Sequence, residues 1–452
     1  MSHNVPAGTQ QVASMDVKSL TAADSNGNGQ LSPACRAKDT KMKAGNPKMN
    51  GENLGWNGEN LGRNADSKDS RQTSNGDVRL AGVEEYDYVH LTVYDLHTRA
   101  KGRLIRASML PQVASAGMGM YAGICFTAIN GLLTKDGFGE RHRYGNLNMM
   151  PDMSTLAPCL GVTSGQRRIG QVICDMAHLD GTKDLTCPRV AALHQLSRLR
   201  ERGLTMLCGV EMEFTLTDLA TGQGFGHTNQ FTDMNVLCHS QDLLLDFMED
   251  AQEMGISLTT LQVEEGVGAF EFTTDPMTGI EAIDVTARLR NAMDVFFKSR
   301  GYQVSFMTMQ TLDPGTATVQ QLNHSLWTAD GQNALHDSSD PQGLSKVARH
   351  WLAGLVHHGP ALTAFGLPTV NCYSSFVQLE MPRVTPQIPR DLRTALSALQ
   401  EDAVMVQALG PDLVQRFVHC KTTHEIQVLQ TRVGDSREEI FGWERDMYFS
   451  RV

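Results

Sequence analysis

The chain has 452 residues, of which 41% are hydrophobic, and a formal net charge of -11 at pH 7. This length exceeds one ordinary domain, and the acidic charge argues against nucleic acid or an anionic membrane as the main partner. There is no apolar run of transmembrane length and no secretory signal pattern. The nine cysteines form no CxxC pair, which is typical of reduced thiols in a cytoplasmic protein.

Residues 1–82 are rich in Gly, Asn, Ser, Asp and Lys and poor in aromatic side chains. The segment GENLGWN at 51–57 is followed directly by GENLGRN at 58–64, but each copy has one leucine and two glycines, so no coiled-coil seam can form. Such a composition cannot bury enough apolar surface to offset the entropy lost on folding. We therefore expect a disordered N-terminal tail over residues 1–82.

Ordered structure is predicted to begin with a small, mostly β domain over residues 83–182. DYVHLTVYDL at 87–96 has the alternating, β-rich pattern of a strand, and AKGRLIRAS at 100–108 is predicted to be its hairpin partner. RRIGQVICDM at 167–176 predicts a further strand of the same region.

Residues 183–452 alternate between helical and strand patterns. Helices are predicted at 187–203 and 277–301, where apolar residues recur at helical spacing and a glycine lies at the end. GYQVSFMTM at 301–309 and TVQQLNHSLW at 318–327 predict strands. We expect an α+β body in which helices cover an antiparallel sheet.

The segment LSKVARHWLAGLVHHG at 344–359 is predicted to be a helix. Its spacing indicates an inward face made of Leu344, Val347, Trp351 and Leu355. By pattern alone, the chain after this helix is also expected to end in a run of helices, over roughly its last 60 residues.

Four glutamates lie in two apolar segments, GVEMEF and VEEGVGAFEFTT: Glu211, Glu213, Glu264 and Glu271. Residues two apart share one face of a strand, so the first two point the same way. Carboxylates that converge without cations cost several kcal/mol, and Mg²⁺ or Mn²⁺ are natural partners for such oxygen ligands. At this point two interpretations stay open. The glutamates form a divalent-cation site, or each is solvated at a strand end or paired with an arginine.

Several blocks, in their order and spacing, resemble the catalytic domain of the glutamine synthetase family: GVEMEFTLTD, EEGVGAFEFTT, NHSLW and WLAGLVHHGPALTAFGLPTVNCY. The likeness runs from about residue 84 to the end, and YDLHTRAKGRLIRAS resembles the family's small β-grasp domain. The resemblance implies an α+β fold, with a β-grasp domain at 83–182 and a catalytic-type domain at 183–452. It also implies ATP and two divalent cations that serve phosphoryl transfer to a glutamate side chain, which ammonia then attacks.

The resemblance carries the family's cation ligands onto residues of this chain. One cation is held in the family by three glutamates, which match Glu213, Glu264 and Glu271. The other is held by a glutamate matching Glu211, by a histidine and by a late glutamate, for which Glu380 is the candidate.

The chain departs from the family at several of these positions. The two histidine positions before SLW read Gln321 and Asn323, and His324 lies one residue away on the other face of the strand. Gln321 still offers a carbonyl oxygen, which Mg²⁺ accepts. The Lys-Arg pair expected after PTVNCY is replaced by Ser374 and Ser375.

The arginine-rich segment that follows this pair in the family is missing, and Arg383 and Arg390 have no matching role. Losing an arginine that stabilises a transferring phosphoryl group costs roughly 10³-fold or more in rate.

This combination of a glutamine-synthetase body, a degraded site and an N-terminal tail is similar to a non-catalytic eye-lens branch of the family. It implies a cytoplasmic structural protein, a dodecamer of two hexameric rings with cytoskeletal or membrane-skeleton partners. The alternative is an active ligase that uses ATP and Mg²⁺ or Mn²⁺ to join glutamate, or another amino acid, to ammonia or another amine.

Overall fold

The computed structural model describes residues 82–141, 145–159, 167–226, 231–312, 317–374, 388–434 and 436–451. Apart from Gly82, the predicted tail lies outside these ranges, and so do Ser375, Glu380 and Arg383. Among the helices in the described ranges, none combines the length and the apolar content needed to cross a bilayer.

The first sheet is mixed and has the strand order β2-β1-β6-β4-β3, with β5 paired to β6. β1 and β2 form an antiparallel hairpin, whereas β1 and β6 run parallel. The strands predicted at 87–96, 100–108 and 167–176 are therefore confirmed, and the hairpin with them. The bounds are β1 (Tyr88–Tyr94), β2 (Ala100–Arg106), β3 (Met118–Tyr121), β4 (Asn146–Pro151), β5 (Ala157–Pro158) and β6 (Ile169–Ala177), with helices α1 (Leu110–Ala116) and α2 (Phe138–Arg141).

The second sheet is built around one long strand, β7, which pairs antiparallel with β9, β10, β11 and β12. β8 pairs antiparallel with β9 at the edge. The predicted antiparallel sheet is thus confirmed. Its strands are β7 (Leu204–Asp218), β8 (Leu258–Val263), β9 (Ala269–Thr274), β10 (Met277–Thr278), β11 (Tyr302–Ser305) and β12 (Gln320–Thr328).

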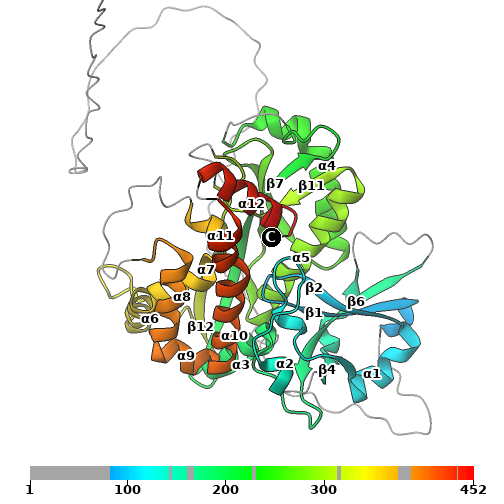
Figure 1. Ribbon diagram of the computed structural model, residues 1–452. Helices are drawn as coiled ribbons and strands as arrows, with labels where there is room; N and C mark the ends of the chain where they lie inside the picture. The colour runs from blue at the N-terminus through cyan, green and yellow to red at the C-terminus, as the bar shows by residue number, and fades with distance from the viewer. Residues whose placement is uncertain are drawn as a thin grey trace, which may run out of the picture. The chain divides into compact units, whose positions relative to one another are not determined.

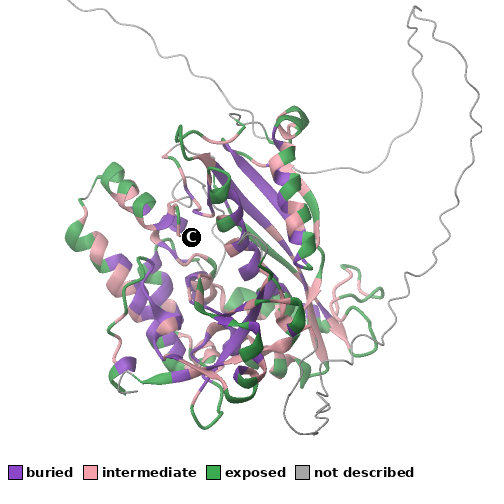
Figure 2. Ribbon diagram, turned by 90° about the vertical axis from the view of Figure 1, so that its right-hand side faces the viewer, coloured by how far each residue is buried: buried purple, intermediate pink, exposed green. Residues whose placement is uncertain are grey.

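Two long helices, α4 (Met234–Glu253) and α5 (Ile280–Ser299), bury one face of this sheet, and Figure 1 shows both beside β7 and β11. The buried face is aromatic: the Phe214 ring stacks on Phe272 at 5.0 Å, and Phe247 meets Phe297 at 5.3 Å. Figure 2 shows these strands buried while the outer side of the flanking helix stays exposed. α3 (Pro188–Arg200) precedes β7, with a proline in its first turn, where the missing N–H costs nothing.

The C-terminal part is helical, as predicted. Its apolar side chains join the core of the first sheet, so Leu396 and Phe417 share one cluster with Val89 and Leu91. The helices are α6 (Lys346–His357), α7 (Gly359–Gly366), α8 (Leu392–Glu401), α9 (Ala403–Leu409), α10 (Pro411–Lys421), α11 (Gln427–Arg432) and α12 (Arg437–Tyr448), with a π-helical segment at Thr422–Ile426. Short 3-10 helices lie at Val83–Glu85, Ala107–Met109, Ile124–Phe126, Met153–Thr155 and Val370–Tyr373.

The predicted inward face of α6 is wrong in part. Within the described residues, α6 buries only Ala348. Val347 and Leu355 keep 37% and 38% of their surface exposed. Trp351 is half-buried and contacts His324 of β12. Helical spacing identified the apolar stripe, but the stripe is only partly covered by the rest of this chain.

Candidate functional site

Strand β7 positions the first two glutamates. Met212 and Phe214 are fully buried in the core beneath α4 and α5. Because side chains alternate across a strand, Glu211 and Glu213 project from the opposite face. The aromatic core therefore determines which way the two carboxylates point.

Strand pairing brings the remaining glutamates to the same place. Glu271 of β9 lies directly opposite Glu213 of β7, and Gln262 of β8 lies opposite Glu271 on its other side. Glu264 follows β8 immediately, at the start of the turn into β9. Gly268 completes this turn with φ of 74°, and a Cβ atom there would lie 2.5 Å from a carbonyl oxygen of β7.

The carboxylates are buried and influence one another. Glu213 and Glu271 keep only 9% and 6% of their surface exposed. Desolvation, reinforced by the negative charges of Glu264 and Glu211, raises the pKa of each of these two carboxyls to about 7. The backbone N–H of Val319 donates to Glu213 Oε2 at 2.9 Å, which opposes this shift in Glu213.

None of the four glutamates forms an ion pair with a lysine, arginine or histidine in the described part of the chain. The interpretation that each is paired with an arginine is therefore wrong for these ranges. The charges that act on Glu213 and Glu271 are those of other carboxylates. Such a cluster is stable only if it holds protons or binds a cation.

Gln262 is a member of this cluster that sequence reasoning missed. Its Nε2 donates to Glu264 Oε1 at 2.6 Å and to Glu271 Oε1 at 3.1 Å. One neutral amide thus bridges two carboxylates. The spacing of Gln262 two residues before Glu264 was the available signal, because it predicts a shared direction on an extended segment.

The amide side chains of Gln321 and Asn323 occupy the two positions at which the family has histidines. Asn323 Nδ2 donates to Glu211 Oε1 at 2.7 Å, and Gln321 lies opposite Glu211 in the pairing of β12 with β7. His324 is engaged elsewhere, because its Nε2 accepts a hydrogen bond of 2.8 Å from Trp351 Nε1 of α6. The imidazole is therefore no substitute ligand.

The other predicted positions are not brought into contact with the glutamates. Ser374 follows the short helix Val370–Tyr373, and its backbone N–H donates to the Asn371 carbonyl at 3.1 Å. Arg390 is exposed just before α8. The side chain of Asn371, in the same short helix, donates from Nδ2 to Glu444 Oε2 of α12 at 2.9 Å. Burial raises the pKa of the Glu444 carboxyl to about 7.

The glutamate cluster offers the type of ligand that a hard divalent cation prefers, but its side chains are not arranged as a complete coordination shell. Three buried or half-buried acids without counter-ions offer the oxygen ligands that Mg²⁺ and Mn²⁺ prefer. In the described ranges, however, no three carboxylate, imidazole or thiol groups converge closely enough to form a complete cage. Gln262 N–H groups lie against two of the acids.

Residues 185–385 and 376–441 match the family described as glutamine synthetase, catalytic domain, and together they span more than half of the 452 residues. The chain belongs to the glutamine synthetase family. Among its relatives is lengsin of Canis lupus familiaris, 26% identical over 63% of this chain and 49% of the relative. The chain thus spans about half the length of that protein. Glutamate–methylamine ligase of Methyloversatilis universalis is 27% identical over 64% of each chain.

A solved structure described as a novel glutamine synthase homolog shares the fold. Its TM-score is 0.69 at 19% identity, and the match covers 82% of this chain and all of the other. The predicted α+β glutamine-synthetase-like fold is therefore confirmed.

Proposed function

We propose that this chain is a non-catalytic member of the glutamine synthetase family that keeps one divalent-cation site and serves as a structural protein of the lengsin type. The observation that carries the proposal is the Asn323 amide on Glu211, with Gln321 opposite, where the family has histidine positions. A cation at this half of the site would have to displace the bond between Asn323 and Glu211, and it would find Gln321 and Asn323 at the positions where the family has imidazole ligands. The serine at Ser374, in place of a basic residue, supports the same conclusion.

Glu213, Glu264 and Glu271 would hold the remaining cation. Their carboxylates carry no counter-ion in the described residues. The pKa values of Glu213 and Glu271 near 7 reflect burial first and then repulsion between carboxylates, which a cation would relieve. The Gln262 side chain would have to turn away, because its N–H groups occupy oxygens that the cation needs. When bound, such a cation neutralises the negative charge of the three glutamates. We propose that its role in this chain is to stabilise the sheet that carries them.

A second candidate is a working ATP-dependent ligase that joins an amino acid to an amine. The cluster of unpaired glutamates favours it, and so does the likeness to glutamate–methylamine ligase. Its weakness is the loss of basic residues that bind the transferring phosphoryl group. A fold does not by itself provide the chemistry of its relatives.

Phosphate release from ATP with Mg²⁺ or Mn²⁺ tests the two candidates directly. The assay is run with and without glutamate, and with ammonium or methylamine as the amine. The non-catalytic proposal predicts no release above that of a Glu213→Gln variant. Release that requires both substrates and disappears in Glu213→Gln would instead establish a ligase.

Cation binding is measured separately, because it does not depend on turnover. We expect Mg²⁺ to raise the melting temperature of the wild-type protein by several degrees and to have little effect on Glu213→Gln. Glu249→Gln is the matched control, because Glu249 is exposed on α4. An equal Mg²⁺ response in all three proteins would contradict the assigned site.

The assembly and its partners belong to the same proposal. We propose a cytoplasmic dodecamer of two hexameric rings, supported by the exposed apolar residues Val347, Leu352 and Leu355 on α6. Sedimentation of the purified protein tests the ring assembly. The segment 1–82 is proposed to contact cytoskeletal or membrane-skeleton components, and equal capture of such partners by protein lacking it would contradict this assignment.

A further inference from the structure

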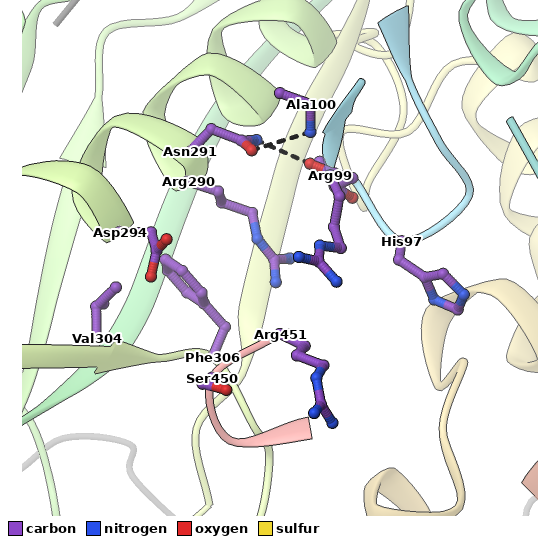
Figure 3. A pocket seen from close by; sticks show the side chains of 11 residues that line it. His97, Arg99, Ala100, Arg290, Asn291, Asp294, Val304, Phe306, Ser450 and Arg451 are labelled. Atoms are coloured by element: carbon purple, nitrogen blue, oxygen red, sulfur yellow. Dashed lines mark hydrogen bonds between the residues drawn. The ribbon is translucent and has the colours of Figure 1, made fainter. Parts of the chain in front are cut away.

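A pocket distinct from the glutamate cluster gathers three arginines from separate parts of the chain. Arg99 lies in the turn between β1 and β2, Arg290 on α5 and Arg451 after α12. Figure 3 shows the guanidinium groups of Arg99 and Arg290 close together above Arg451. The cavity has a volume of about 140 Å³ and is also lined by His97, Asn291, Asp294, Val304 and Phe306, among others.

The turn that carries Arg99 is fixed to α5. Asn291 Nδ2 donates to the Thr98 carbonyl at 2.8 Å, and Asn291 Oδ1 accepts from the Ala100 N–H at 3.0 Å. Asp95 Oδ1 accepts from the Arg99 N–H at 3.0 Å. Thr98 has φ of 62°, a conformation that non-glycine residues adopt only at a cost. These bonds hold a strained turn in the one position that places Arg99 beside Arg290.

The arginine side chains are also anchored. The Arg290 guanidinium carbon lies 4.4 Å from the centre of the Phe306 ring, which lines the same pocket. Arg451 Nη1 donates to the Met447 carbonyl at 3.2 Å, and Arg99 Nη1 donates to a backbone carbonyl at 3.2 Å. Each guanidinium therefore has donors left over after it is anchored, since it carries five N–H groups.

The positive charge of the pocket is not neutralised within the described residues. None of the three arginines forms an ion pair there. Asp294 also lines the cavity, and its Oδ1 accepts from Gln303 Nε2 at 3.4 Å. Desolvation lowers the pKa of Arg290 to about 10, which still leaves it charged at neutral pH. Three arginines against one aspartate leave a local excess of two positive charges.

We propose that this pocket binds a phosphoryl group, as free phosphate or as the phosphate of a small monoester. The planar forks of guanidinium groups match phosphate oxygens, and a dianion balances the excess charge of the pocket. The volume is below the roughly 300 Å³ at which pockets for larger organic ligands begin, which excludes a buried nucleotide. The site shares no residue with the glutamate cluster, so it goes beyond the proposed function.

Equilibrium dialysis of radiolabelled inorganic phosphate against the whole protein tests the site, with EDTA present and without nucleotide. We expect one saturable site per chain. Arg290→Gln and Arg451→Gln should each weaken binding about tenfold or more, because each removes charge-assisted hydrogen bonds. Arg393→Gln, which removes an exposed arginine of α8, is the control and should leave binding unchanged.

Arg290→Lys keeps the charge but not the fork, and we expect it to bind more weakly than wild type and more tightly than Arg290→Gln. Competition by glycerol phosphate would identify monoesters as ligands, and its failure would identify free phosphate; both support the site. Three results would overturn the proposal: no saturable binding at about 10 mM phosphate, equal weakening by Arg393→Gln, or stronger binding of succinate than of phosphate.

Discussion

At the scale of single residues, the most informative side chains are the buried acids Glu213 and Glu271. Burial in the folded chain removes both carboxyls from water, and their neighbours in the cluster are also acidic. Both effects favour the protonated form, so the site holds protons that a cation can displace. The electrostatics of the cluster thus couple pH, cation binding and stability.

The first prediction concerns pH. The pKa of Glu213 and of Glu271 is about 7 in the folded protein against an ordinary value of 4.5, so the folded state binds more protons between these values. Without a divalent cation, the free energy of unfolding should therefore fall as the pH rises from about 4.5 to about 7, by about 2–3 kcal/mol for each of the two carboxyls. Urea unfolding in EDTA across this range measures the slope. Glu213→Gln should reduce the slope, because it removes one of the two titrating carboxyls, and Glu249→Gln should leave it unchanged.

The second prediction concerns Gln262. Gln262→Met keeps the side-chain volume but removes both hydrogen bonds to Glu264 and Glu271. We expect a loss of about 1–3 kcal/mol in EDTA, because two carboxylates lose their shared donor. Mg²⁺ should restore more stability to this variant than to wild type. Equal Mg²⁺ responses, read by thermal unfolding, would show that the amide does not compete with a cation.

At the scale of elements, the turn between β8 and β9 sets the register that joins Glu264, Glu271 and Glu213. Gly268 in this turn has φ of 74°, and a Cβ there would lie 2.5 Å from the Leu216 carbonyl oxygen. Only glycine fits such a close approach of two backbones. The turn is thus as necessary to the site as the acids themselves.

The third prediction compares two glycines with the same backbone conformation. Gly222→Ala places a Cβ in open space at φ of 71°, whereas Gly268→Ala also meets the backbone of β7. We expect Gly222→Ala to cost about 1 kcal/mol and Gly268→Ala about 3 kcal/mol or more in urea unfolding. Similar costs for both would mean that the turn can move away from β7.

At the scale of the whole molecule, one buried arginine connects distant parts of the chain. Arg189 of α3 donates to Asp175 of β6 at 2.6 Å, to Asp152 after β4 at 2.8 Å and to Asp284 of α5 at 2.8 Å. The side chain keeps 5% of its surface exposed. It therefore links the first sheet to the helix that covers the second.

The fourth prediction follows from this network. Arg189→Met leaves three acids without their shared cation, and we expect a loss of about 3–5 kcal/mol in the free energy of unfolding. Arg200→Met changes an exposed arginine on the same helix and should stay within about 0.5 kcal/mol. A small effect of Arg189→Met on the urea midpoint would show that water or lysine compensates the acids.

Much of the fold was predictable because its signals are local. Alternation identified β1, β2 and β6, and helical spacing identified α3, α5 and α6. The two faces of β7 were also predictable, since strict alternation separates Glu213 from Phe214. The cation assignment for the glutamates remains a proposal. The extent to which the apolar face of α6 is buried was not predictable, because helical spacing identifies such a face but not the segments that pack against it.

Short-range periodicity and residue identity were enough to predict the helices and strands, the family resemblance and the shared direction of Glu211 and Glu213. By contrast, the hydrogen bonds from Gln262 to two acids and the three arginines around one pocket became evident in the folded chain. These two arrangements depend on strand register and on packing between segments far apart in the chain. Strand register and long-range packing leave no local pattern in the sequence, so they could not be predicted from it.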